Sequence, residues 1–148
     1  MKCRCLMMIG VVLMLAAVDT DEEVKKELAK FEGTWKYVCV ESEKMKVSED
    51  ALKGLRLKIQ GDKFTVTGEN ADAAFSGTFK VDPSKKPKTI DVTFSDGPEK
   101  GKTTLGIYEL EGDTYKACID PAGKARPTEF AIKPGSGHAL VIHKREKK

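Results

Sequence analysis

Short segments in which apolar and polar residues alternate make up most of the sequence from residue 55 onwards. Leu57 and Ile59 alternate with Arg56 and Lys58, and residues 64–67 repeat the pattern. Because successive side chains of a strand point to opposite faces, each such segment predicts a strand with one buried face. Turn-forming Gly, Asp and Pro residues separate the segments. The pattern argues against a parallel sheet, in which helices would alternate with the strands.

Nine strand candidates follow one another, most of them about 8 to 12 residues apart, which is typical of an antiparallel sandwich or barrel. They cover residues 34–41, 55–59, 64–67, 75–81, 90–94, 102–110, 114–120, 128–133 and 139–144. A single open sheet of this size would leave one apolar face and two unpaired edges, and closure into a barrel removes both problems. We therefore expect an all-β antiparallel barrel of about eight to nine strands, with an interior that is filled or shaped into a small cavity.

Two short helical segments are also predicted. Residues 21–31 place Val24, Leu28 and Phe31 at helical spacing behind an acidic first turn, which favours a short amphipathic helix. Ser48 is a suitable N-cap for a helical turn that ends near residue 53. Both segments lie outside the strand candidates and leave the all-β prediction unchanged.

The N-terminal segment, residues 1–18, is typical of a secretory signal peptide. Lys2 and Arg4 precede an apolar run over residues 6–18 that ends in small residues. The run is 13 residues long, whereas a transmembrane helix needs about 20. A retained membrane anchor is the alternative. We expect a signal peptide over 1–18, a barrel domain over 19–148 and an extracytoplasmic, periplasmic or secreted, location without a membrane span.

The charge balance gives no support for nucleic-acid binding. The net charge is +3, and removal of Lys2 and Arg4 with the signal peptide leaves +1. Nucleic-acid binding would require a clustered basic face, and the only basic cluster is the C-terminal tail, which we interpret as solvated. We expect a soluble monomer.

Cys39 and Cys118 remain after signal removal, and an oxidising compartment would favour a disulfide between them. Alternation places Cys39 on the face of Trp35, whereas Cys118 lies opposite Tyr115. A disulfide requires Cα atoms within about 7 Å, so opposite facing disfavours the bond. The sequence leaves both alternatives open.

Catalytic chemistry has little support in the sequence. His138 and His143 are five residues apart and would point to opposite faces of one strand, which disfavours a shared metal ion. We interpret them as a turn residue and a surface strand residue. A nucleophile elbow and a phosphate-binding glycine loop are both lacking. We expect no catalytic residues, no metal and no cofactor.

The loop that follows Asp120 is the best candidate for a binding site. Arg126 offers a planar guanidinium for a carboxylate or phosphate, and Lys124 adds a second positive charge. In the alternative, which we favour, Arg126 pairs with Glu129 or Asp120 and fixes the loop. Pro127 supports this structural interpretation because it is a turn-forming residue.

Several turn and strand motifs resemble those of a family of uncharacterised small proteins, described from planctomycete bacteria, that carry a lipocalin-like domain. The resemblance covers essentially all of the chain after the signal peptide. It rests on residues 33–35, 82–88, 97–101, 106–109, 112–113 and 121–130, the last with a Gly-Lys-x-Arg-Pro-Thr-Glu-Phe core. It implies a lipocalin-like (calycin-type) barrel and no established activity.

The lipocalin comparison extends to three residues. Gly33 and Trp35 resemble the Gly-x-Trp signature of the first lipocalin strand, and Arg145 resembles the arginine that stacks on that tryptophan. The resemblance implies a cation-π contact between the first and last strands, worth about 0.5 to 2 kcal/mol. Arg145 has the parity of His143 rather than of Ile142, which leaves its facing undecided.

We expect noncovalent binding of a small hydrophobic or amphipathic ligand in the barrel mouth, since such barrels offer a concave site. Tyr108 is a further candidate for the cavity wall, although tyrosines on strands usually belong to the core. One alternative is an interaction module with a filled barrel that binds a protein or an envelope polymer. A hydrolase of unknown type is a third hypothesis. A cavity of about 300 Å³ or more with converging polar groups would favour ligand binding.

Overall fold

A computed structural model describes residues 21–68 and 73–147 of the protein. The predicted signal peptide, residues 1–18, lies outside the described residues. Residues 21–31 form a helix, as their periodicity predicts. A second helix, α2 (Glu49–Lys53), begins after Ser48, whose hydroxyl accepts a hydrogen bond from Ala51 N at 3.3 Å. The predicted N-cap is therefore confirmed.

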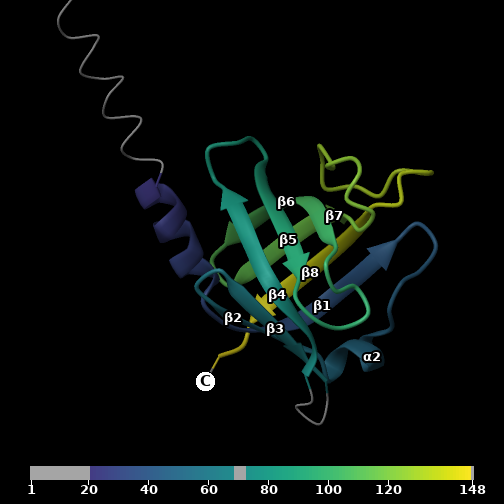
Figure 1. Ribbon diagram of the computed structural model, residues 1–148. Helices are drawn as coiled ribbons and strands as arrows, with labels where there is room; N and C mark the ends of the chain where they lie inside the picture. Colours follow the sequence, from purple (N-terminus) through teal and green to yellow (C-terminus); the bar gives the residue numbers. More distant parts are fainter. Residues whose placement is uncertain (1–20, 69–72, 148) are drawn as a thin grey trace, which may run out of the picture.

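Within the described residues, eight strands form one closed antiparallel barrel of lipocalin-like architecture (Figure 1). The strands are β1 (Gly33–Ser42), β2 (Arg56–Gln60), β3 (Lys63–Thr67), β4 (Ala73–Asp82), β5 (Lys88–Phe94), β6 (Thr103–Glu111), β7 (Thr114–Asp120) and β8 (Ala139–Arg145). Each strand pairs with its neighbours in sequence, and β8 pairs with β1 to close the sheet. The predicted all-β barrel is confirmed.

One of the nine strand candidates, residues 128–133, is not a strand. It belongs to a long loop between β7 and β8, at the upper right of Figure 1. Because β7 already pairs with β6 on one side and β8 on the other, this segment has no free edge to join. It packs on the outer wall instead, where Cys118 Sγ lies 3.8 Å from Ala131 O and Lys116 Nζ lies 4.6 Å from the Phe130 ring centroid.

The barrel has two different ends, which we call the helix end and the loop end. The helix end carries residues 21–31, the turns after β2, β4 and β6, and the end of β8, and lies at the left of Figure 1. The loop end carries α2 and the loops after β1, β5 and β7. Trp35 is paired with Arg145 near the helix end, and Ser42 with Ala139 near the loop end.

Aromatic side chains pack the interior near the helix end. Phe31 and Trp35 are fully buried. The Phe31 ring lies 5.3 Å from that of Phe79, 5.2 Å from that of Tyr108 and 5.0 Å from that of Tyr115, between ring centroids. Such tilted and edge-to-face pairs each add about 0.5–1.5 kcal/mol beyond the burial of their area. The helix therefore contributes a core residue as well as covering the barrel.

A bulge in β1 changes which residues face the interior. Tyr37 pairs with His143 and Cys39 with the preceding residue of β8, so Val38 is the extra residue. Val40, rather than Cys39, then lines the interior. The prediction that Cys39 shares the face of Trp35 is wrong for this reason.

The two cysteines are free thiols among the described residues. Cys39 pairs with β8, and Cys118 pairs with the other side of β8. One strand therefore separates them, at about 10 Å for two strand spacings, which is too far for a disulfide. The physical reason is the intervening strand, not opposite facing.

The prediction for His143 is also wrong, because this residue is only 4% exposed and points inward together with Val141. The segment over residues 139–143 is apolar on both faces, so alternation alone did not indicate which face is buried. His138 lies before β8 in the loop, where its Nε2 is 3.1 Å from Ala125 O.

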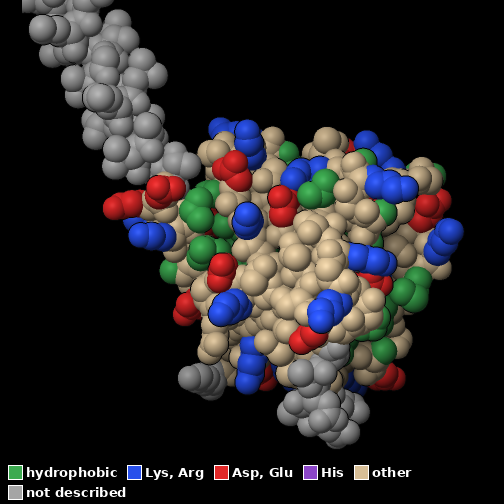
Figure 2. Space-filling model, viewed as in Figure 1, with side chains coloured by type: hydrophobic (Ala, Val, Ile, Leu, Met, Phe, Trp, Pro, Cys, Tyr) green, Lys and Arg blue, Asp and Glu red, His purple; other side chains and the backbone are tan. Residues whose placement is uncertain are grey.

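The outer wall carries charges of both signs. Figure 2 shows Lys and Arg side chains interspersed with Asp and Glu on the face of the barrel that is in view. Across the described residues, no helix has the length and apolar character needed to span a membrane.

Candidate functional site

The barrel interior contains a cavity of about 240 Å³. Phe31 and Phe79 form part of its floor toward the helix end, and side chains from all eight strands form its wall, with Thr104 as the contribution of β6. The described residues that line it include no Lys, Arg, Asp or Glu. The cavity is therefore an apolar site inside the fold, of the kind that barrel proteins use for small ligands.

Two glycines contribute to the shape of this interior because they have no side chain. Gly77 shares the inward parity of Phe79, and a Cβ atom there would lie 2.8 Å from Phe64 Cε1. Gly106 shares the parity of Thr104, and a Cβ atom there would lie 2.7 Å from Ile119 Cγ2. A Cβ atom would also clash with the backbone oxygen of Thr93 at Gly77 and of Cys118 at Gly106, so glycine at these positions lets the neighbouring backbone and side chains pack closely.

His143 is the unusual residue of the cavity wall. Its ring stacks on Tyr115 with centroids 4.9 Å apart and an interplanar angle of 11°, and Tyr37 meets it edge-on at 4.5 Å. Neither ring nitrogen has a well-aligned hydrogen-bond partner among the described residues, although a backbone contact with Tyr115 opposes part of the effect of burial on the pKa of the ring. Burial lowers the pKa of His143 to about 3. At neutral pH the ring is therefore uncharged, with one N–H donor and one nitrogen acceptor available.

Two tyrosines share the environment of His143. Burial raises the pKa of Tyr37 and the pKa of Tyr115 well above the usual tyrosine range. All three pKa shifts have burial as their main cause, and all three keep the groups neutral near pH 7. The cluster therefore offers uncharged donors and acceptors rather than an acid and base pair.

The loop end gives the cavity its access. Phe75, Phe94 and Val40 line the cavity near this end and are partly exposed, whereas Phe31 at the floor is fully buried. The rings of Phe64, Phe75 and Phe94 form a cluster with centroid distances of 5.6 to 6.5 Å. An entering ligand would pass this aromatic rim.

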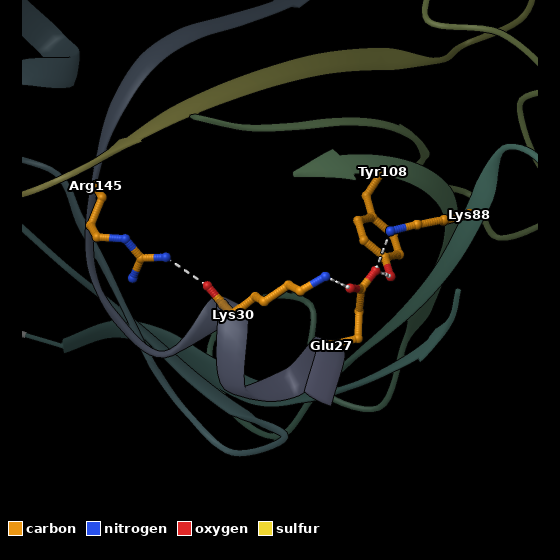
Figure 3. Close-up of polar contacts among 5 residues, drawn as sticks. All are labelled: Glu27, Lys30, Lys88, Tyr108 and Arg145. Carbon is orange, nitrogen blue, oxygen red and sulfur yellow. Dashed lines mark hydrogen bonds and ion pairs between the residues drawn. The ribbon is translucent and has the colours of Figure 1, made fainter. Parts of the chain in front are cut away.

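A polar network closes the helix end (Figure 3). Glu27 projects from the helix, and its Oε2 accepts hydrogen bonds from Lys88 Nζ at 2.7 Å and from the Tyr108 hydroxyl at 2.6 Å. Lys30 lies 3.1 Å from Oε1. Burial alone would raise the pKa of Glu27, but the hydrogen bonds from Lys88 and Tyr108 hold that pKa below its usual value. The carboxylate is thus fully paired and fastens the helix to β5 and β6.

Arg145 closes the same end from the other side. Its guanidinium carbon lies 4.3 Å from the Trp35 ring centroid, and it donates hydrogen bonds to the backbone oxygens of Glu32 and, at 2.6 Å, Lys30. Gly33 has φ 125°, and a Cβ atom there would lie 3.0 Å from Arg145 Nη1. The contact that the Gly-x-Trp resemblance implied is present, and it settles the facing of Arg145.

Arg126 lies on the outer wall, outside the cavity. Its Nη2 is 2.7 Å from Asp91 Oδ1, an ion pair without hydrogen-bond alignment, and its Nη1 donates to Gly106 O at 2.8 Å. The predicted pairing with Glu129 or Asp120 is wrong, since Glu129 pairs with Lys133 at 3.0 Å. Asp91 is 35 residues away in sequence and became a neighbour only through folding.

The rest of this loop is fixed by its own backbone contacts. Asp120 accepts hydrogen bonds from the backbone nitrogens of Ala122, Lys124 and Ala125 at 2.7 to 3.0 Å. Pro127 is buried, and the Lys124 side chain is exposed. Arg126, Lys124 and Tyr108 are therefore not brought together, and none of them lines the cavity.

The lining residues that sequence analysis missed are His143, Tyr37 and Tyr115. A histidine inside a run that is apolar on both faces was the available signal, because such a position leaves little chance of solvent contact for the ring. Pairing of His143 with a tyrosine on each side depends on the barrel register, which no local pattern shows.

Among the described residues, no group of three His, Cys, Asp or Glu side chains is placed to hold a metal ion. A scan against protein-family models finds no match for the chain, and a search of curated proteins finds none either. The resemblance to the family with a lipocalin-like domain therefore depends on the motifs quoted above.

Proposed function

We propose that this protein binds a small, mostly apolar molecule noncovalently inside its barrel. The observation that carries the proposal is the cavity of about 240 Å³, whose wall is apolar and whose described lining residues are uncharged. Removing apolar ligand surface from water is favourable, and a preformed cavity avoids the cost of ordering the site.

The cavity volume limits the ligand. A dry apolar cavity of about 150 Å³ can hold benzene, so 240 Å³ corresponds to a molecule of about ten non-hydrogen atoms. Long acyl chains and large ring systems exceed this volume. For ligands of this size we expect dissociation constants between about millimolar and micromolar.

The wider setting of the proposal comes from the sequence. We place the protein in an extracytoplasmic compartment because residues 1–18 have the pattern of a signal peptide, and in the planctomycete family because of the quoted motifs. We treat it as a binding protein rather than an enzyme, since His143, Tyr37 and Tyr115 in the cavity wall are uncharged at neutral pH. We also treat it as a monomer.

The interaction module is a second candidate, favoured by two observations. The cavity is smaller than the roughly 300 to 1,000 Å³ of ordinary ligand pockets. In addition, Val38 is 42% exposed and Met45 is 61% exposed, so two apolar side chains face solvent. In this alternative the barrel is a rigid support and its outer surface binds another macromolecule.

Ligand titration followed by methyl NMR distinguishes the two candidates. With toluene or indole as the added molecule, we expect saturable shifts of Val66, Val92 and Ile119, which line the cavity. Ala117→Leu should abolish these shifts, because Ala117 is a buried lining residue and the larger side chain fills the space. Ala29→Leu, at an exposed helix position, is the matched control and should retain them.

The interaction module is favoured instead if neither compound shifts the lining methyl signals at millimolar concentration. Native mass spectrometry of protein purified from its own host complements the titration. A reproducible adduct would identify the natural ligand, whereas bare protein together with the absence of NMR shifts would reject the binding function.

A further inference from the structure

His143 is a buried polar residue that the fold itself does not use. It is 4% exposed, and its two nitrogens lack hydrogen-bond partners among the described residues. A buried polar group without a partner is costly, and most such groups in folded proteins have one. Because His143 also lines the cavity, a molecule in the cavity can supply the missing hydrogen bond.

The neighbours of His143 fix the direction of that bond. Tyr115 stacks on the imidazole ring, and Tyr37 packs against it edge-on. The ring is held between two aromatic side chains from β1 and β7, and hydrogen bonds to imidazole form in the ring plane. Because both nitrogens are buried, a partner in the cavity reaches the ring edge only when a neighbouring side chain shifts.

The charge of the surroundings excludes ionic ligands. The described lining residues carry no formal charge at neutral pH, and an unpaired ion in such a site is strongly disfavoured. The nearest cations at the helix end already have partners: Arg145 contacts Trp35 and backbone oxygens, and Lys88 pairs with Glu27. The ligand must be neutral, with a group that can donate to or accept from an imidazole.

The shape of the wall favours a ring. Phe31, Phe64, Phe75, Phe79, Phe94 and Tyr115 all line the cavity. Aromatic side chains pair favourably with a planar ring in edge-to-face and offset arrangements. Together with the limit of about ten non-hydrogen atoms, this describes a single substituted ring.

We infer that the cavity selects small neutral phenols, and that His143 is the residue that recognises the phenolic hydroxyl. This inference rests on the proposed ligand-binding function and adds the ligand class and the specificity residue. The hydroxyl donates to the unprotonated imidazole nitrogen, or accepts from the N–H, while the ring packs among the phenylalanines.

The test compares p-cresol with p-xylene, two molecules of nearly equal shape that differ in one hydroxyl. Dissociation constants are measured by NMR titration for the wild type, His143→Phe and Thr104→Val. We expect His143→Phe to weaken p-cresol binding about ten- to hundred-fold, because the hydroxyl is then buried without a partner. We expect p-xylene binding to change less than threefold, because Phe keeps the size and planarity of the ring. Thr104→Val alters another lining residue and should leave the ratio of the two constants unchanged.

A second measurement does not depend on a variant. The chain contains two histidines, and His138 lies in an outer loop with its Nε2 3.1 Å from Ala125 O. We expect p-cresol to shift the side-chain ¹⁵N resonances of His143 and not those of His138, and p-xylene to shift neither by a comparable amount.

The experiment distinguishes failure of the phenol inference from failure of the proposed ligand-binding function. If both compounds bind and His143→Phe weakens them equally or not at all, the phenol inference is wrong and the cavity function stands. The same conclusion follows if p-cresol binds without moving the His143 nitrogens. If neither compound binds the wild-type protein, the proposed function and the inference fail together.

Discussion

The polar network at the helix end and the wall of the adjoining cavity treat buried polar groups in opposite ways. At the helix end, Glu27 is buried and has Lys88, Tyr108 and Lys30 as partners. In the neighbouring cavity wall, His143 is buried and has no well-aligned hydrogen-bond partner among the described residues. A paired buried group stabilises the fold, whereas an unpaired one costs stability and is available to a ligand. The comparison assigns stability to the helix end and binding to the cavity.

The largest expected effect is the loss of Glu27. Glu27→Ala would leave the Tyr108 hydroxyl and Lys88 without their carboxylate, and we expect the free energy of unfolding to fall by about 2–4 kcal/mol. The lower part of that range applies if water reaches Lys88, whose side chain is 36% exposed. Urea denaturation measures the change. Glu22→Ala, at an exposed position of the same helix, should change stability by less than about 0.5 kcal/mol. Equal effects of the two substitutions would refute the role of this network.

Removal of Arg145 should have the next largest effect. Arg145→Ala loses the contact with the Trp35 ring and the hydrogen bonds to Lys30 and Glu32, and we expect a loss of about 1–3 kcal/mol. Arg145→Lys should recover only part of it, because lysine lacks the planar guanidinium. Lys144→Ala, at the exposed neighbouring position, is the control for thermal unfolding. If Arg145→Lys recovered all of the lost stability, the positive charge alone would account for the contribution of Arg145.

The third prediction concerns pH and separates His143 from the helix end. Its pKa is about 3 in the folded protein and 6.5 in the unfolded chain, so only the unfolded state gains a proton as pH falls below 6.5. The folded state therefore loses about 1 kcal/mol of stability between about pH 6.5 and 5.5. Glu27 has a lowered pKa, so its contribution is present above its usual value of 4.5 and is lost only at more acidic pH.

Denaturation curves at these two pH values test the assignment to His143. We expect His143→Phe to abolish the loss of stability between them and to be at least as stable as the wild type, because it removes two unpaired buried nitrogens. His138→Gln should keep the wild-type pH dependence. If His143→Phe still shows the full loss, another group titrates in this window.

The smallest expected effect is that of Arg126 on the outer wall. Its ion pair with Asp91 is partly exposed, so Arg126→Ala should cost about 1 kcal/mol or less. It should not alter p-cresol or p-xylene binding, and Lys124→Ala should change neither the free energy of unfolding nor the affinity for these compounds. A more than threefold loss of affinity with Arg126→Ala would instead support a binding site in the loop after β7, the candidate that the sequence analysis interpreted as structural.

Local patterns predicted the parts of the fold that depend on local physics. Alternation and turn residues identified all eight strands, and the resemblance to lipocalins implied the contact between Trp35 and Arg145 that joins the first and last strands. The errors arose where contacts between segments distant in sequence determine which way a side chain faces or which partner it has. The bulge at Val38 reverses the facing of Cys39. Arg126 forms an ion pair on the outer wall with Asp91, which is distant in sequence.

The candidate site was harder to predict than the fold. The sequence suggested a barrel cavity, but it directed attention to the charged residues Arg126 and Lys124, which lie outside that cavity. The five-residue spacing of His138 and His143 disfavours a shared metal ion, and it led to the interpretation of His143 as a surface strand residue. Its importance depends on burial and on the absence of a partner among the described residues, and both follow from the closed register.

Xenon binding tests the central claim, an accessible apolar cavity inside the barrel, most directly. Crystals of the protein exposed to xenon gas should show xenon between Phe31 and the Phe64, Phe75 and Phe94 cluster, since apolar cavities of this size take up the gas. Ala117→Leu crystals should show reduced occupancy or none. A wild-type interior without xenon, closed by side chains that fill the 240 Å³ space, would contradict the account.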